Sequence, residues 1–112
     1  MSENTFAYNT VKAEPTKKIT IVAARWNAEL VDALVKSAKE HLTQIGFKNV
    51  ATVYVPGSWE LVHASQNAIK DSDGVISFGV VIRGDTTHYE LLSETVAQGL
   101  MQISIDANKP LA

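Results

Sequence analysis

From Lys18 onward the chain alternates three times between a short apolar run and a longer segment with apolar residues at helical spacing. The runs at 19–24, 50–55 and 75–80 are rich in β-branched residues, which is typical of strands buried on both faces of a sheet. Only a few residues separate each run from the next helical segment, so we expect right-handed βαβ crossovers. This order predicts an α/β fold built on a parallel sheet.

Capping residues set the expected limits of the helices. We expect Asn27 to cap the first helix and Gly46 to end it in the left-handed region. The second helix is expected to start near Ser58, and Thr87 with Glu90 forms a capping box for the third. The expected buried stripes are Leu30, Leu34, Ala38, Leu42 and Ile45; then Leu61, Val62, Ala64, Ala68 and Ile69; then Leu92, Val96, Leu100 and Ile103.

Composition excludes several classes of protein. The 112 residues suffice for one domain, and a net charge of −2 argues against nucleic acid as the main partner. The absence of cysteine excludes disulfides and thiolate metal sites, and the three histidines lack metal-ligand spacing. No apolar run approaches a membrane span or a secretory signal, which favours a cytoplasmic protein. We expect residues 1–17 to form a flexible arm, or a strand that becomes ordered only when it packs on a neighbouring molecule. The domain is expected at residues 18–112.

Polar and aromatic residues follow each predicted strand. Open parallel sheets bind ligands at the carboxyl ends of their strands, which here means 25–27, 56–60 and 81–88. The only two tryptophans, Trp26 and Trp59, both fall in these turns. Each Trp also fits simple packing against its helix, and acids such as Glu60 favour helix starts in any case. The coincidence of three such turns nevertheless predicts a binding site along this edge.

The turn after the third run combines an anion site with a proton carrier. A phosphate is expected on the N–H groups of Asp85 and Thr86, because a helix N-terminus attracts anions. His88 at the helix start can act as general acid and base, although it also fits a solvated residue. A flat ring stacked on Trp26 is expected to have its polar edge bound by Glu60 and nearby backbone. This chemistry needs no metal.

Three motifs together carry a specific resemblance. They are Ala24-Arg25-Trp26-Asn27, Val55-Pro56-Gly57-Ser58-Trp59-Glu60 and Gly79-Val80-Val81-Ile82-Arg83-Gly84-Asp85-Thr86-Thr87-His88-Tyr89-Glu90. In this combination and order, the chain from about Ile19 to its end closely resembles the lumazine synthase family. The resemblance implies a three-layer α/β/α, flavodoxin-like parallel sheet. It implies a cofactor-free transferase of riboflavin biosynthesis, which condenses 5-amino-6-(D-ribitylamino)uracil with 3,4-dihydroxy-2-butanone 4-phosphate to 6,7-dimethyl-8-ribityllumazine.

The resemblance also implies roles for individual residues. His88 is expected to carry protons. The expected pyrimidine and ribityl contacts are Trp26, Asn27, Ser58, Trp59, Glu60, Val80, Val81 and Ile82. The expected phosphate contacts are Gly84, Asp85 and Thr86.

The chain departs from the family pattern in two ways. Thr87 and Tyr89 replace a frequent Pro and Phe, but keep the helix cap and the aromatic ring. More seriously, the sequence stops at Ala112, where the family begins its last strand and two closing helices. Those elements supply an aromatic wall and a phosphate-binding arginine in the family. We therefore expect the third strand to have an open edge and one face of the sheet to lack helices. Without the arginine, we expect weak binding of the butanone phosphate. A fragment of a longer gene product or a truncated reading frame would explain this pattern.

Other functions stay open from sequence. The family forms homopentamers, sometimes assembled into shells, so a homo-oligomer is expected. The alternatives are a non-catalytic flavin- or lumazine-binding homologue and a shell-forming homologue. A phospho-acceptor receiver domain has the same order of elements, but it needs an acidic residue where Arg25-Trp26-Asn27 stands.

Overall fold

The computed structural model describes residues 14–84 and 88–112. Its elements are β1 (Lys18–Ala24), α1 (Ala28–Gln44), β2 (Asn49–Val55), α2 (Ser58–Lys70), β3 (Gly74–Phe78) and α3 (His88–Ala107). The three strands are parallel in the order β2-β1-β3, and Ile21 of β1 lies opposite Thr52 of β2 and Ile76 of β3. The α/β prediction is confirmed, and every predicted strand and helix is present.

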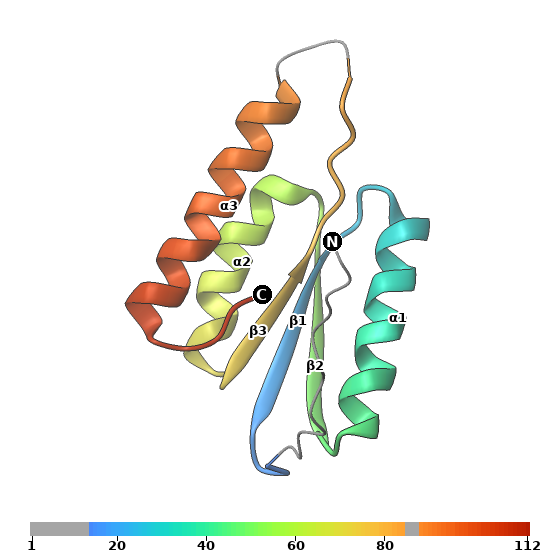
Figure 1. Cartoon of the computed structure of the whole chain (residues 1–112), viewed down its shortest axis with the longest axis vertical. Helices are drawn as coiled ribbons and strands as arrows, with labels where there is room; N and C mark the ends of the chain where they lie inside the picture. Colours follow the sequence, from blue (N-terminus) through green and yellow to red (C-terminus); the bar gives the residue numbers. More distant parts are fainter. Residues whose placement is uncertain (1–13, 85–87) are drawn as a thin grey trace, which may run out of the picture.

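Helices cover both faces of the sheet (Figure 1). α1 packs on one face, and α2 and α3 pack side by side on the other. Alternate residues of β1 point to opposite faces, so Ile21 packs on the α1 side and Val22 on the α2 side. The three-layer arrangement is therefore confirmed, although α1 covers its face alone within the described residues.

The buried stripe of α1 differs from the prediction. Leu30 and Leu34 are 56% and 42% exposed, whereas Val31 and Val35 are buried against the sheet. Asn27 occupies the N-cap position in the left-handed region (φ 57°), but its side chain makes no capping hydrogen bond. The predicted Asn27 side-chain cap is therefore wrong, and so are the first two positions of the stripe.

The buried residues of α2 and α3 largely match the prediction. Leu61 and Ile69 of α2 and Val96 and Ile103 of α3 are buried. The two helices approach closely at Gly99. A Cβ added to this glycine would lie only 2.9 Å from Val62 Cγ1. At the start of α3, Thr87 and its capping box lie outside the described residues.

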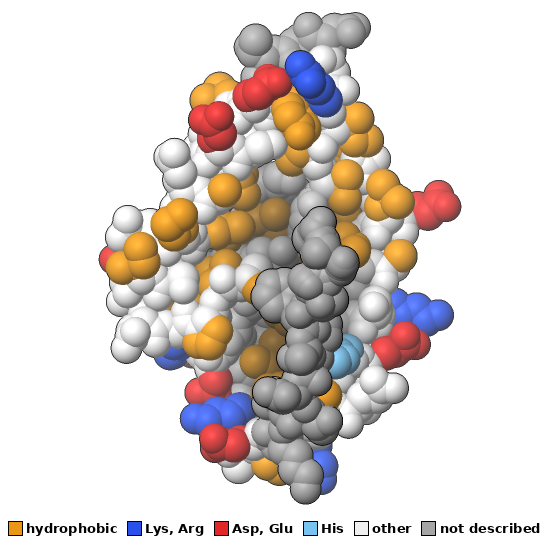
Figure 2. All heavy atoms as spheres, viewed as in Figure 1, with side chains coloured by type: hydrophobic (Ala, Val, Ile, Leu, Met, Phe, Trp, Pro, Cys, Tyr) orange, Lys and Arg blue, Asp and Glu red, His pale blue; other side chains and the backbone are white. Residues whose placement is uncertain are grey.

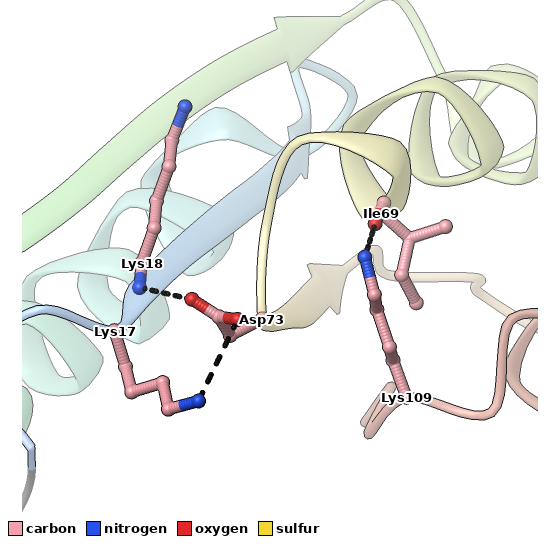
Figure 3. Close-up of polar contacts among 5 residues, drawn as sticks. All are labelled: Lys17, Lys18, Ile69, Asp73 and Lys109. Carbon is pink, nitrogen blue, oxygen red and sulfur yellow. Dashed lines mark hydrogen bonds and ion pairs between the residues drawn. The ribbon is translucent and has the colours of Figure 1, made fainter.

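Polar contacts close the end of the sheet opposite the predicted site (Figure 3). The Lys18 backbone N–H donates to Asp73 Oδ2 at 2.8 Å, and Lys17 Nζ lies 4.0 Å from Asp73 Oδ1. Lys109 Nζ donates to the carbonyl of Ile69 at 2.8 Å and so stabilises the C-terminal end of α2. The first two contacts tie the start of β1 to the turn before β3, and the third ties the exit of α3 to the end of α2.

The edge of β3 is partly paired. Val75 N–H donates to the Pro110 carbonyl at 3.1 Å, and Ser77 N–H donates to the Ala112 carbonyl at 2.8 Å. Leu111 forms a parallel bridge with Val75. The expectation of an open third-strand edge is therefore wrong for Val75 and Ser77, because the chain turns after Asn108 (φ 53°) and runs back along β3.

Candidate functional site

Backbone hydrogen bonds join the turns that follow β1 and β2. Arg25 N–H donates to the Val55 carbonyl at 2.7 Å, and Trp26 N–H donates to the Pro56 carbonyl at 3.2 Å. These bonds hold the turn after β1 against the end of β2 and the turn that follows it. As a result, Trp26 is held beside the segment that leads into α2.

The first turn of α2 is fixed by its own carboxylate. Glu60 Oε1 accepts a hydrogen bond from Gly57 N–H at 2.8 Å, which satisfies one of the free donors at the helix start. The same turn holds Ser58, which is buried, and Trp59, which is 44% exposed. One oxygen of Glu60 is therefore committed to the turn rather than directed at a ligand.

The chain leaving β3 passes close to this turn. A Cβ on Gly79 would lie 2.7 Å from Leu61 Cδ1 and 2.8 Å from Ser58 Oγ. A larger residue would force the side chains of Leu61 or Ser58 to move, so glycine suits this close approach. The close passage brings Val80, Val81 and Ile82 alongside the start of α2.

A cavity of about 440 Å³ opens where these segments meet. Hydrophobic side chains gather around the hollow between the two helical layers (Figure 2). The cavity is lined by Trp26, Pro56, Gly57, Ser58, Trp59, Glu60, Val80, Val81, Ile82, Gly84, His88, Tyr89 and Leu92. Its volume suits a small organic molecule.

His88, the first residue of α3, faces Trp59 across the cavity. Their ring centroids lie 6.2 Å apart with the planes tilted by 58°. Arg83 Nε lies 3.9 Å from Glu90 Oε1, so an exposed ion pair spans the turn before α3.

The cavity combines apolar ring faces with the imidazole of His88 and the carboxylate of Glu60. This set is suited to holding a flat, polar-edged ring near a proton carrier.

Most of the predicted site residues come together in this cavity. The exceptions are Asn27, which does not line it, and Asp85 and Thr86, which lie outside the described residues. Asn27 Nδ2 is buried and finds no hydrogen-bond partner in the part of the chain that the structure describes. The roles assigned to all these residues stay predictions.

Four lining residues were not assigned a role from the sequence, and two of them, Tyr89 and Leu92, also lie outside the predicted ranges. Pro56 and Gly57 belong to a motif already singled out, and Tyr89 follows His88 directly. Leu92 lies four residues after His88 and therefore on the same face of α3. Helical spacing from His88 is the signal that identifies Leu92.

Residues 14–84 and 88–112 lack two kinds of feature. No group of three or more His, Cys, Asp or Glu side chains is arranged to hold a metal ion there. No helix in the same ranges is long and apolar enough to cross a membrane.

The fold is shared with proteins of solved structure. The ABC domain in complex with L-Trp from Streptococcus pneumonia superposes with a TM-score of 0.55 at 18% sequence identity. The match covers 87% of this chain and 29% of that one. At this identity the likeness concerns the fold alone.

Sequence comparisons identify the family. The family model for 6,7-dimethyl-8-ribityllumazine synthase matches residues 16–112. The enzyme of that name from Schizosaccharomyces pombe is 39% identical over 102 residues, which are 87% of this chain and 64% of the relative. The one from Xanthomonas oryzae pv. oryzae is 37% identical over 101 residues, which are 87% of this chain and 66% of the relative. The chain thus spans about two thirds of the length of these relatives, and it belongs to the 6,7-dimethyl-8-ribityllumazine synthase family.

Proposed function

We propose that this chain takes part in the condensation of 5-amino-6-(D-ribitylamino)uracil with 3,4-dihydroxy-2-butanone 4-phosphate. The observation that carries the proposal is that Trp26, the start of α2, the segment 80–82 and His88 all line one and the same cavity. Three separate turns contribute to this cavity, at the edge of the sheet where α/β folds bind ligands. Membership of the lumazine synthase family supports the choice of reaction.

The pyrimidine ring stacks on Trp26 in this proposal. The Trp26 side chain is 61% exposed, so one face of its indole is open to a ligand. The ribityl chain and the ring edge contact Ser58, Trp59 and the backbone of 80–82. Glu60 has its second carboxylate oxygen for a ligand hydroxyl, since Oε1 accepts the Gly57 N–H.

His88 moves protons between the two reactants. The substrate amine attacks the ketone and a first water leaves as the imine forms. Phosphate is then eliminated, and the resulting enol tautomerises to a ketone. The second nitrogen attacks this ketone, and a second water leaves as the ring closes. Each stage requires a proton to be taken from nitrogen or carbon or given to oxygen, which suits an imidazole. Gly84 lines the cavity beside His88, in support of a phosphate position at Gly84, Asp85 and Thr86.

We also propose that the chain acts as a homo-oligomer, a pentamer or a pentamer-based shell, in the cytoplasm. Large apolar side chains are exposed on the outer side of α3 at Leu91, Met101 and Ile105, each more than 60%. Such surfaces are typical of association. Native mass spectrometry of the purified chain tests this, and a monomer at micromolar concentration contradicts it.

A single-turnover assay with both substrates tests the reaction. Lumazine formation, followed by its fluorescence, supports the enzyme. Binding of the pyrimidine without turnover favours the alternative, a non-catalytic flavin- or lumazine-binding homologue. Absence of pyrimidine binding contradicts both.

A further inference from the structure

The contact between Trp59 and His88 joins the starts of two helices. Trp59 is the second residue of α2, and His88 is the first residue of α3. The ring centroids are 6.2 Å apart and the planes are tilted by 58°, within the range of favourable aromatic pairs. Both rings line the same cavity, so the contact lies where a ligand would bind.

The Trp59 side of this contact is held firmly. The preceding Gly57 N–H is bound by Glu60 Oε1 at 2.8 Å, and Ser58 is buried beneath the turn. α2 and α3 are locked together by the close approach of Gly99 to Val62. The turn that carries the indole is therefore held in place, and the imidazole of His88 lies against that indole with the ring centroids 6.2 Å apart.

We infer that Trp59 is a positioning residue for His88, in addition to any contact it makes with a ligand. The indole restricts the imidazole to orientations that direct it into the cavity. The inference rests on the proposed function for its catalytic meaning, because His88 is the proton carrier there. The ring contact itself is independent of any reaction and can be measured without substrate.

Proton NMR of the chain tests the contact directly. The sequence has only three histidines, His41, His63 and His88, so His88→Gln assigns the imidazole signals of His88 by their loss. We expect an NOE between the Trp59 indole and these protons in the unmodified chain. Trp59→Leu removes the ring current and should shift the His88 signals, whereas Trp59→Phe keeps an aromatic face and much of the shift.

The signals of His41 on α1 serve as the internal reference, since α1 lies on the opposite face of the sheet. Unmoved His41 signals show that the fold survives the substitution. Absence of the NOE in the unmodified chain overturns the inference, as do His88 signals that Trp59→Leu leaves in place. The NOE needs no variant, so the test stands even where a variant fails to fold.

Single-turnover rates separate a role through His88 from a role in binding. Loss of an aromatic pair should slow the chemical step roughly 2- to 10-fold in Trp59→Leu, with partial rescue in Trp59→Phe. In the His88→Ala background the same substitution should slow the chemical step by a smaller factor than in the unmodified chain. An equal loss in both backgrounds overturns the inference and leaves the proposed function intact. An inactive chain that retains the NOE contradicts the proposed function and leaves the ring contact standing.

Discussion

Replacement of Gly79 by alanine should destabilise the fold at the point where β3 meets α2. The added Cβ would lie 2.7 Å from Leu61 Cδ1 and 2.8 Å from Ser58 Oγ, closer than real Cβ atoms approach their neighbours. The Ser58 hydroxyl can rotate away, but Leu61 is only 3% exposed and cannot move without disturbing the core. The substitution therefore acts as overpacking.

The magnitude follows from two opposing effects. Overpacking costs about 1–3 kcal/mol, while replacing Gly with Ala recovers about 0.4–1 kcal/mol from the unfolded chain. The expected net loss in the free energy of unfolding is about 1–2 kcal/mol. With an unfolding entropy of about 2.1 cal/mol/K per residue over 112 residues, 1 kcal/mol corresponds to about 4 °C. Gly79→Ala should therefore lower Tm by about 4–9 °C.

Thermal unfolding followed by circular dichroism measures this difference. Gly84→Ala is the matched control, because no atom lies within 4 Å of the position its Cβ would take. It keeps the gain from the unfolded chain without the overpacking, so its Tm should rise by about 2–4 °C. Pyrimidine binding should also weaken in Gly79→Ala, since Ser58 lines the cavity. A Tm for Gly79→Ala equal to that of Gly84→Ala would refute the overpacking argument.

Three further substitutions test other parts of the molecule. His88→Ala should slow single turnover by roughly 100-fold; a rate within a few-fold of the unmodified chain removes His88 from proton transfer. Trp26→Ala should weaken pyrimidine binding by about 1–3 kcal/mol in titration calorimetry, and unchanged affinity means that the ring does not stack there. Ser65→Ala deletes a 2.6 Å hydrogen bond to Ser77 between α2 and β3. It should lower the free energy of unfolding, measured by urea denaturation, by about 1–3 kcal/mol. An unchanged midpoint of the urea transition would mean that this hydrogen bond does not stabilise the fold.

Local patterns explain why the order of elements was predictable. Each strand is a short β-branched run, and each helix is bounded by residues with a strong turn preference, such as Gly46 at φ 109° and Asn108 at φ 53°. The β-branched runs locate the strands, and the turn-forming residues mark where each helix ends. Their alternation restricts the fold to a parallel sheet with crossovers, which puts the cavity at the carboxyl ends of the strands.

The rotation of α1 could not be read from the same patterns. Leu30 with Leu34 and Val31 with Val35 each continue through Ala38 and Leu42 at helical spacing, so the sequence offers two stripes. The left-handed backbone at Asn27 sets how the helix leaves β1, and the sheet then buries the Val pair. The choice depends on tertiary packing, which no single segment encodes.

The pairing of Pro110 and Ala112 with β3 was equally hidden. Only three residues follow Lys109, too few to predict a strand, and their contact with Val75 spans more than thirty residues of sequence. Tyr89 and Leu92 were overlooked as cavity residues for a related reason. Their sequence features also fit helix packing, and the spacing from His88 that places Leu92 on the same face of α3 was not applied to the site.

The close approach of Gly99 to Val62 has a consequence for the far end of α3. His88 lies eleven residues before Gly99, about 16 Å along the helix at 1.5 Å per residue. A rotation of α3 by about 5° around this crossing point therefore displaces the imidazole by about 1.4 Å. Displacements of about 1 Å at a reacting group can slow a reaction roughly 100-fold. The small size of Gly99 thus sets the crossing of α3 over α2, and through it the position of the His88 imidazole at the start of α3.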